Sequence, residues 1–355
     1  MNQVIELVKT NEKKSKPSVG SLGFGKYFTD YMFVMDYTKD KGWHGPKITP
    51  YEPLVLEPSS MVFHYGQAIF EGLKAYKTKE GKVLLFRPDK NIRRLNLSCE
   101  RISIPPLDED VVLEAIKQLV DLEKDWIPDE EGTSLYIRPF IIATEPYLGV
   151  RPSEQYKLMV ILSPVGSYYS GQLTPTKIYV EDKYVRAVPG GVGYVKTSGN
   201  YAASLKAQEE AEEQGYDQVL WLDAIEKKYI EEVGSMNIFF KVKGEVITPE
   251  LNGSILGGIT RDSVIQLLKH WGIPVREERI SVEDVFNAYH NGELEEVFGA
   301  GTAAVISPVG ELKWKDEHII VNGNQIGDLS MRLYEAITNI QLGKEEDILN
   351  WTVEL

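Results

Sequence analysis

The chain has 355 residues, 43% of them hydrophobic and 26% charged, and this length favours two domains over a single core. Its formal net charge of −14 argues against a nucleic-acid or anionic-membrane partner, because such polyanions repel an acidic surface. No apolar run approaches the roughly 20 residues needed to cross a bilayer. A single cysteine, Cys99, and the lack of a signal-peptide pattern predict a cytoplasmic protein without intrachain disulfides.

The first half alternates strand-like and helix-like segments. Apolar and aromatic residues predict strands over 28–37, 134–144 and 156–163. Apolar residues spaced three or four apart predict a helix over 90–102, and a second helix over 108–126 is stopped by a following proline. The pattern then breaks into Gly, Ser, Tyr and Pro, which is typical of a connection between domains.

The second half continues the alternation. We expect strands over 177–181, 217–223, 236–242 and 245–248, and helices over 200–214, 260–271 with Thr260 as the N-cap, and 281–291 with a capping box between Ser281 and Asp284. The order predicts a mixed α/β (α+β) fold in two domains. The predicted smaller domain spans 1–166, an interdomain loop spans 167–176, and a larger domain spans 177–355.

Several common chemistries find no support in the residues. None of the five histidines pairs with another at metal-ligand spacing, so we expect no metal site, and no P-loop occurs. Gly299 to Ala304 satisfies the loose G-x-G-x-x-A dinucleotide pattern, but this pattern must open a helix in order to hold a pyrophosphate. The residues that follow it read as a β segment, which argues against a dehydrogenase.

Two segments favour a different chemistry. Gly258 directly before Thr260 and its helix allows backbone N–H groups to converge on an anion, although an ordinary capped helix has the same pattern. Lys196 lies among small and apolar residues, with no acid nearby in the sequence. A lysine in such surroundings has a lowered pKa and can form a Schiff base, although a surface lysine beside glycines looks the same.

Six motifs together resemble the branched-chain aminotransferases, which are pyridoxal 5'-phosphate (PLP) enzymes of fold type IV. The resemblance runs along nearly the whole chain and is closest to the longer form of the family. The motifs are 63–72 (FHYGQAIFEG), 136–139 (YIRP), 196–201 (KTSGNY), 232–237 (EVGSMN), 258–261 (GITR) and 298–303 (FGAGTA). The implied reaction is reversible amino transfer between L-leucine, L-isoleucine or L-valine and 2-oxoglutarate.

The resemblance assigns the cofactor-binding residues. Lys196 would form the Schiff base and act as general acid and base, and Tyr201 would hydrogen-bond the phenolic oxygen of PLP. Glu232 would keep the pyridine nitrogen protonated; the residues alone do not distinguish it from Glu231. The remaining implied cofactor-binding residues, mostly around the phosphate, are Arg94, Ser235, Ile259, Thr260 and Thr302.

The resemblance also implies a substrate pocket. Aromatic walls for an aliphatic side chain would come from Phe24, Tyr65, Phe70 and Tyr168. Tyr136, with the backbone of Thr302 and Ala303, would hold the α-carboxylate, and Arg138 would pair with the distal carboxylate of 2-oxoglutarate or glutamate. Val150 would reach the active site of the partner subunit in a homodimer.

The chain departs from the mammalian mitochondrial members, which carry a Cys-x-x-Cys where Ala304 and Ser307 stand here. We therefore expect activity that is insensitive to mild oxidation. Two other fold-type IV activities, D-amino-acid aminotransferase and aminodeoxychorismate lyase, share the lysine, the glutamate and the phosphate site; the tyrosine and arginine at 136 and 138 favour the branched-chain enzyme. A catalytically silent homologue would be expected to lack Lys196 or Glu232, and both are present.

Overall fold

The computed structural model describes residues 4–166 and 173–355, which fall into two compact units. Unit 1 comprises residues 1–168, 195–198 and 339–355, and unit 2 comprises residues 169–194 and 199–338. Most of the predicted interdomain loop, including Tyr168, lies outside the described residues. The predicted division assigns 195–198 and 339–355 to the second domain, whereas their backbone pairing joins them to unit 1.

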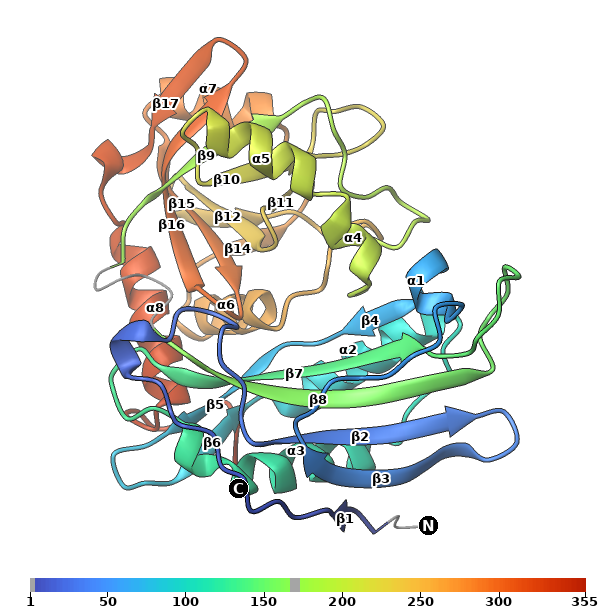
Figure 1. Ribbon diagram of the computed structural model, residues 1–355. Coiled ribbons are helices and arrows are strands. Elements are labelled where there is room, and N and C mark those ends of the chain that lie inside the picture. The colour runs from blue at the N-terminus through green and yellow to red at the C-terminus, as the bar shows by residue number, and fades with distance from the viewer. Residues whose placement is uncertain (1–3, 167–172) are drawn as a thin grey trace. The chain divides into compact units, whose positions relative to one another are not determined.

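Unit 1 is built on one mixed sheet covered on one face by helices (Figure 1). In the described part of the chain its strand order is β1-β3-β2-β8-β7-β5-β6-β18, and β4 pairs with β7. The strands are β1 (Glu6–Leu7), β2 (Tyr31–Thr38), β3 (Gly42–Pro50), β4 (Ala68–Phe70), β5 (Leu73–Lys77), β6 (Val83–Phe86), β7 (Ser134–Ala143), β8 (Gln155–Val165) and β18 (Thr352–Glu354). The helices are α1 (Met61–Tyr65), α2 (Pro88–Arg101) and α3 (Glu109–Leu122), with 3-10 turns at Val19–Ser21 and Lys124–Trp126.

The core of unit 1 lies between its sheet and helices α2 and α3. Each of these two helices is amphipathic, and their buried stripes include Leu95 and Ile116, at 1% and 0% exposure. Along β7, Leu135 and Ile137 face this core and are fully buried. The residues that alternate with them, Tyr136 and Arg138, therefore point to the opposite face, because side chains alternate along a strand.

Unit 2 contains a second mixed sheet with helices packed against it (Figure 1). Its described strand order is β11-β10-β9-β16-β15-β12-β13-β14, and β17 pairs with β16. The strands are β9 (Thr176–Glu181), β10 (Gln218–Leu222), β11 (Ile230–Val233), β12 (Asn237–Val242), β13 (Glu245–Thr248), β14 (Val275–Glu277), β15 (Leu294–Gly301), β16 (Val305–Trp314) and β17 (Glu317–Ile320). The helices are α4 (Ser198–Ala202), α5 (Leu205–Glu213), α6 (Ile259–His270), α7 (Val282–His290) and α8 (Asp328–Gln341), with a 3-10 turn at Val321–Asn324; α4 begins in unit 1 and α8 ends there.

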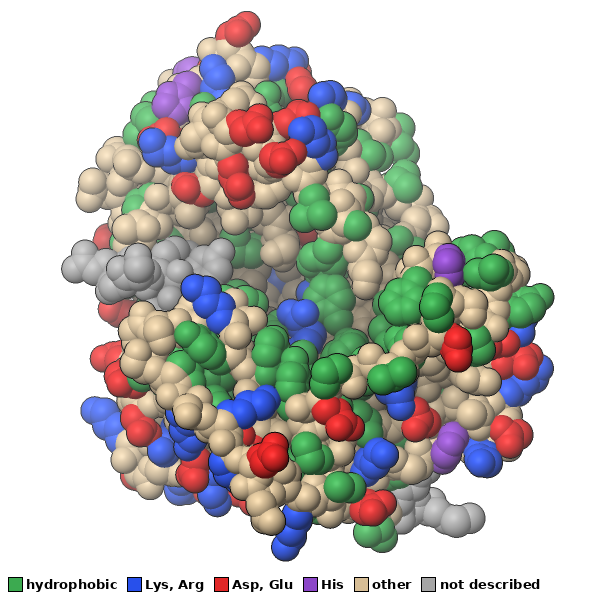
Figure 2. Space-filling model, viewed as in Figure 1, with side chains coloured by type: hydrophobic (Ala, Val, Ile, Leu, Met, Phe, Trp, Pro, Cys, Tyr) green, Lys and Arg blue, Asp and Glu red, His purple; other side chains and the backbone are tan. Residues whose placement is uncertain are grey.

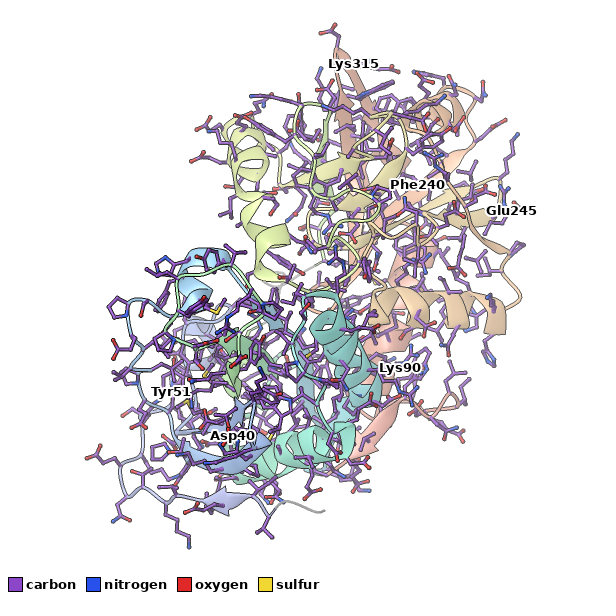
Figure 3. All side chains as sticks on the ribbon, turned by 90° about the vertical axis from the view of Figure 1, so that its right-hand side faces the viewer. Asp40, Tyr51, Lys90, Phe240, Glu245 and Lys315 are labelled. Atoms are coloured by element: carbon purple, nitrogen blue, oxygen red, sulfur yellow. The ribbon has the colours of Figure 1, made fainter. Side chains whose placement is uncertain are left out.

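Figure 3 labels a buried and an exposed residue of unit 2. Phe240 in β12 lies within the unit and is fully buried, whereas Lys315 lies at the tip of the β16–β17 hairpin. The predicted capping box is confirmed, since the Ser281 side chain accepts from the Asp284 N–H while the Asp284 carboxylate accepts from the Ser281 N–H. The predicted β segment after Gly301 is also confirmed as β16.

Two predicted helix boundaries are wrong. The helix expected over 200–214 is divided into α4 and α5, and between them the Ser204 hydroxyl donates to the carbonyl of Tyr201 at 2.8 Å. The N-cap of α6 is Gly258, not Thr260. A Cβ at position 258 would lie 2.0 Å from Oδ1 of Asn237, so only glycine fits at this start.

Among residues 4–166 and 173–355, no helix has the length and apolar character to span a membrane. Within the same residues, no group of three or more His, Cys, Asp or Glu side chains is placed to hold a metal ion.

Candidate active site

Lys196 is attached to the unit 1 sheet through its backbone. The N–H of Phe70, at the end of β4, donates to the Lys196 carbonyl at 3.0 Å, and Ile69 forms a β-bridge with Thr197. The Lys196 N–H donates to Oγ of Ser98 on α2, also at 3.0 Å. This anchoring places Nζ of Lys196 4.6 Å from the centre of the Phe70 ring.

A wall of aromatic rings and one arginine occupies the face of the sheet opposite the helices. Arg138 Nη2 donates to Oη of Tyr136 at 3.0 Å, and the Arg138 guanidinium lies 4.7 Å from the Phe70 ring centre. The ring of Phe24 meets Tyr136 edge-on at 4.9 Å. A Cβ on Gly72 would lie 1.9 Å from Oη of Tyr136, so this glycine leaves the space that the tyrosine fills. Five predicted residues are therefore brought together: Phe24, Phe70, Tyr136, Arg138 and Lys196.

This wall carries more positive charge than the sequence motifs indicate. In the described part of the chain, Nε of Arg138 is buried without a hydrogen-bond partner, and an anionic ligand could supply one. Lys74 lies directly opposite Tyr136 across the β5–β7 pairing, and burial lowers its pKa to about 8. A lysine and an arginine beside aromatic rings form a face suited to a molecule with an apolar chain or a carboxylate.

Two predicted substrate residues lie elsewhere in unit 1. Tyr65 on α1 donates a hydrogen bond to the carbonyl of Leu148, and Val150 is 84% exposed. With Phe63 and Tyr147 they form an exposed apolar surface, hereafter the α1 patch, which consists of Phe63, Tyr65, Tyr147, Leu148 and Val150. Figure 2 shows hydrophobic side chains gathered around α1.

Arg94 lies on the buried face of α2 and is held by a carboxylate. Its Nε donates to Oε1 of Glu71 at 2.7 Å and its Nη2 donates to Oε2 at 2.9 Å. Both side chains are buried, at 10% and 1% exposure. Glu71 stands inside a family motif, but no pattern in the sequence links it to Arg94, since the two are 23 residues apart.

In unit 2, Glu232 is buried in β11 and held from two sides. Oε1 accepts from the N–H of Leu256 at 2.7 Å, and Oε2 lies 3.1 Å from Nη2 of Arg186. Arg186, a second residue that sequence reasoning missed, also donates to the carbonyl of Ser254 at 2.8 Å. The neighbouring Glu231 instead accepts from the Ser254 hydroxyl, and burial raises its pKa.

The same segment leads from Glu232 to the start of α6. The Leu256 carbonyl accepts from Nδ2 of Asn237 at 2.9 Å, and the Leu256 N–H donates to Glu232. The backbone of Leu256 is therefore bonded to the side chains of both Asn237 and Glu232. Gly258 follows in an extended conformation, and α6 begins at Ile259. The first N–H groups of a helix have no acceptor within the helix, so those of Ile259 and Thr260 suit a phosphate.

The remaining predicted unit 2 residues lie in turns or short helices. Thr302 and Ala303 occupy the turn between β15 and β16, where Gly301 passes close over Met236. Ser235 is exposed in the turn between β11 and β12. Tyr201 is partly buried on α4, next to Asn200, whose Nδ2 donates to the carbonyl of Val192 at 2.8 Å.

The two sets of residues offer complementary chemistry. Unit 1 supplies an amine, an arginine and an apolar wall, and unit 2 supplies a buried carboxylate and a helix start without a capping side chain. An amine can attach a carbonyl group, a carboxylate can pair with a protonated ring nitrogen, and a helix start can bind phosphate. Each of these groups, taken separately, suits one part of a phosphorylated, nitrogen-containing aromatic aldehyde.

Comparison with known proteins assigns the chain and its fold to a class. The sequence pattern of the class IV aminotransferases matches residues 68–312. Among solved structures, the branched-chain amino acid aminotransferase of Escherichia coli is similar with a TM-score of 0.76 and 28% identity, over 91% of this chain and 98% of that one. The T.th. branched-chain amino acid aminotransferase, complexed with N-(5'-phosphopyridoxyl)-L-glutamate, is similar with a TM-score of 0.74 and 27% identity, over 90% of this chain and 97% of that one.

Sequence relatives narrow the class further. Branched-chain-amino-acid transaminase 1 of Bacillus subtilis is 68% identical over 100% of both chains, and branched-chain-amino-acid aminotransferase 2 of the same organism is 61% identical over 99% of this chain and 97% of its own. The chain therefore belongs to the branched-chain-amino-acid aminotransferases within the class IV family.

Proposed function

We propose that this chain catalyses reversible amino transfer between branched-chain L-amino acids and 2-oxoglutarate, with PLP attached to Lys196. The observation that carries the proposal is the unit 1 wall, where Lys196, Phe70, Arg138 and Tyr136 form one chain of contacts. Apolar rings suit the aliphatic substrates, and the arginine suits the second carboxylate of the acidic one. One wall can therefore serve both substrates in turn.

Bound PLP supplies an electron sink for the electrons released when the α-hydrogen of the substrate leaves. The amine of Lys196 would hold the cofactor, and, once the amine of the substrate has replaced it on the cofactor, would carry the proton to and from the α-carbon. Glu232 keeps the pyridine nitrogen protonated, supported by Arg186 at 3.1 Å. Tyr201 donates to the phenolic oxygen.

The phosphate of PLP is held by the N–H groups of Ile259 and Thr260, by Thr302 and by Arg94, with Ser235 close to the cofactor. The substrate α-carboxylate is held by Tyr136 and the turn at Thr302 and Ala303. Support for these roles comes from the family motifs and from the helix start at Gly258, which fits an anion. Phe24 adds to the aromatic wall through its contact with Tyr136.

The test is spectroscopic. The purified protein should show a visible band of lysine-bound PLP that L-leucine converts and D-alanine does not. Lys196→Ala should lack the band and lose turnover by at least about 10²–10⁴-fold, while the exposed control Lys206→Ala should behave as wild type. Conversion by D-alanine alone would favour a D-amino-acid aminotransferase, and failure to bind PLP in excess would refute the proposal.

We further propose that the chain forms a homodimer through the α1 patch, so that Val150 reaches the partner's active site. The support is the exposure of the patch, with Val150 at 84%, Phe63 at 62% and Leu148 at 62%. Sedimentation of the wild type should give a dimer, and Val150→Asp with Leu148→Asp should give monomers. A monomeric wild type would refute this arrangement.

A further inference from the structure

Glu71 is a buried carboxylate for which the proposed reaction has no direct use. It lies at the junction of β4 and β5, and its side chain is 1% exposed. Its two oxygens accept from Nε and Nη2 of Arg94, at 2.7 and 2.9 Å, which is the bidentate geometry of a strong charged pair. Oε2 also accepts from Nδ2 of Asn91 at 2.8 Å and from the N–H of Gly72 at 3.2 Å.

Helix α2 brings these partners to the same side as Lys196. Asn91, Arg94 and Ser98 are three and four residues apart, so they share one face of the helix. The first two bind Glu71, and the third accepts from the backbone N–H of Lys196 at 3.0 Å. On the sheet side, Glu71 directly follows Phe70, whose N–H donates to the Lys196 carbonyl. One helix face and one strand end thus fix Glu71, Arg94 and Lys196 in the same structural frame.

The charged groups in this region are the positive Arg94 and Lys196 and the negative Glu71. Burial by itself would raise the pKa of Glu71, but the Arg94 guanidinium, the hydrogen bonds from Arg94 and Asn91, and the positive charge of Lys196 together lower it below its ordinary value. The carboxylate is therefore ionised and is the negative charge that Arg94 and Lys196 share.

The hydrogen bonds also fix the direction of Arg94. A guanidinium carries five N–H groups in a rigid plane, and Glu71 accepts from two of its three nitrogens. The plane cannot rotate without breaking both bonds. Its remaining edge, with Nη1, is therefore held in one orientation.

We propose that Glu71 is a positioning residue for the cofactor, which orients Arg94 toward the phosphate and supplies the negative charge beside Lys196. The inference rests on the proposed function, because it assumes that PLP is bound by Arg94 and Lys196. It adds a residue that binds neither substrate nor cofactor. The alternative is a buried ion pair that stabilises only the fold of unit 1.

The test compares Glu71→Gln with the wild type in two measurements on the PLP-loaded enzyme. The first is the dissociation constant of PLP, which should rise at least about tenfold because Arg94 is no longer fixed by a charged bond. The second is the pH at which the visible band of the lysine-bound cofactor changes. This midpoint should fall by about one unit, because a nearby negative charge that favours the protonated nitrogen is lost.

Glu123→Gln is the matched control. Glu123 is another carboxylate buried in unit 1, at 2% exposure, but it binds the N–H of Tyr31 rather than Arg94. Its variant should keep the wild-type PLP affinity and the wild-type midpoint. If Glu71→Gln behaves like this control in both measurements, the proposal is overturned and the pair is only structural.

Glu71→Asp separates the two parts of the role and guards against misfolding of the glutamine variant. The shorter side chain keeps the negative charge but cannot reach both nitrogens of Arg94. We expect a midpoint close to that of the wild type together with weaker PLP binding. Wild-type PLP affinity in Glu71→Asp would overturn the positioning role. A wild-type protein that binds no PLP would instead refute the proposed function, so the two failures are distinguishable.

Discussion

Among the described residues, each unit contains a buried pair of glutamate and arginine, and the two pairs have opposite proposed roles. In unit 1, Arg94 is the member proposed to contact the cofactor, and Glu71 holds it by two bonds at 2.7 and 2.9 Å. In unit 2, Glu232 is the member proposed to contact the cofactor, and Arg186 holds it at 3.1 Å. Under these proposed roles, the same two residue types would present a cationic group to the cofactor in one unit and an anionic group in the other.

The difference follows from what surrounds each pair. Glu71 also accepts from Nδ2 of Asn91 and from the N–H of Gly72, so its carboxylate is bonded by a side-chain amide and a backbone group in addition to Arg94. Arg186 is bound on one side to the carbonyl of Ser254, while Glu232 receives the N–H of Leu256. The surroundings of the two pairs therefore differ: Glu71 is bonded by a side-chain amide and a backbone N–H, whereas both members of the unit 2 pair bond to backbone groups.

The largest expected effect comes from removing the supporting arginine of unit 2. In the cofactor-free protein, Arg186→Met should lower the free energy of unfolding by about 3–5 kcal/mol, because the buried Glu232 carboxylate loses its guanidinium partner. Urea unfolding measures this, and the double variant with Glu232→Gln should recover much of the loss. As a control, Arg279→Met breaks an exposed pair with Glu226 and should cost at most about 1 kcal/mol. Equal losses in Arg186→Met and the control would contradict the comparison.

The next effect concerns turnover. Glu232→Gln should reduce kcat by about 10²–10³-fold at saturating PLP, because a neutral amide does not keep the pyridine nitrogen protonated. The neighbouring Glu231→Gln is the matched control and should keep most of the activity, since its carboxylate is bonded to Ser254. Steady-state kinetics with L-leucine measure both. A larger loss of kcat in Glu231→Gln would mean that Glu231, rather than Glu232, pairs with the pyridine nitrogen.

A smaller effect tests a buried carboxylate that has no guanidinium partner. Burial, together with the charge of Asp30, raises the pKa of Glu123 to about 7, against the opposing hydrogen bond from Tyr31. Because the folded pKa lies above the ordinary value, stability decreases as the pH rises from about 4.5 to about 7. Glu123→Gln lacks this titration, so its Tm should match the wild type at about pH 5 and exceed it by roughly 2–4 °C at about pH 8. Parallel Tm curves would count against the shift.

The smallest effect concerns oxidation, because we expect mild oxidants to leave the activity unchanged. Cys99 is fully buried on α2, and burial raises the pKa of its thiol to about 12. A thiol that stays protonated is a poor nucleophile, and Ala304 and Ser307 offer no second cysteine. Mild peroxide should leave the activity unchanged, and a thiol reagent should label Cys99 only after unfolding. Loss of activity that a thiol reductant restores would contradict this prediction.

Secondary structure could be predicted from the sequence wherever one local cause decides it. The capping box at Ser281 and the strand after Gly301 depend on neighbouring residues, and both are confirmed. The start of α6 could not be predicted in this way, because the choice of Gly258 depends on the approach of Asn237 from another strand.

The residues of the candidate site show the same difference between local motifs and long-range contacts. Motif resemblance found Lys196, Arg138 and Glu232, but not their supports, because each support comes from a distant segment. Lys196 has no acid near it in the sequence, yet in the folded chain it interacts electrostatically with Glu71.

The path of the chain has a consequence for cutting this protein into parts. Unit 1 takes its last strand, β18, from the C-terminus, where it pairs with β6, and takes Lys196 from the short segment 195–198 between two stretches of unit 2. A fragment ending at residue 168 would lack both its edge strand and its lysine. The units are therefore interlaced rather than modular, and neither can be exchanged, truncated or expressed as a self-sufficient module by a single cut.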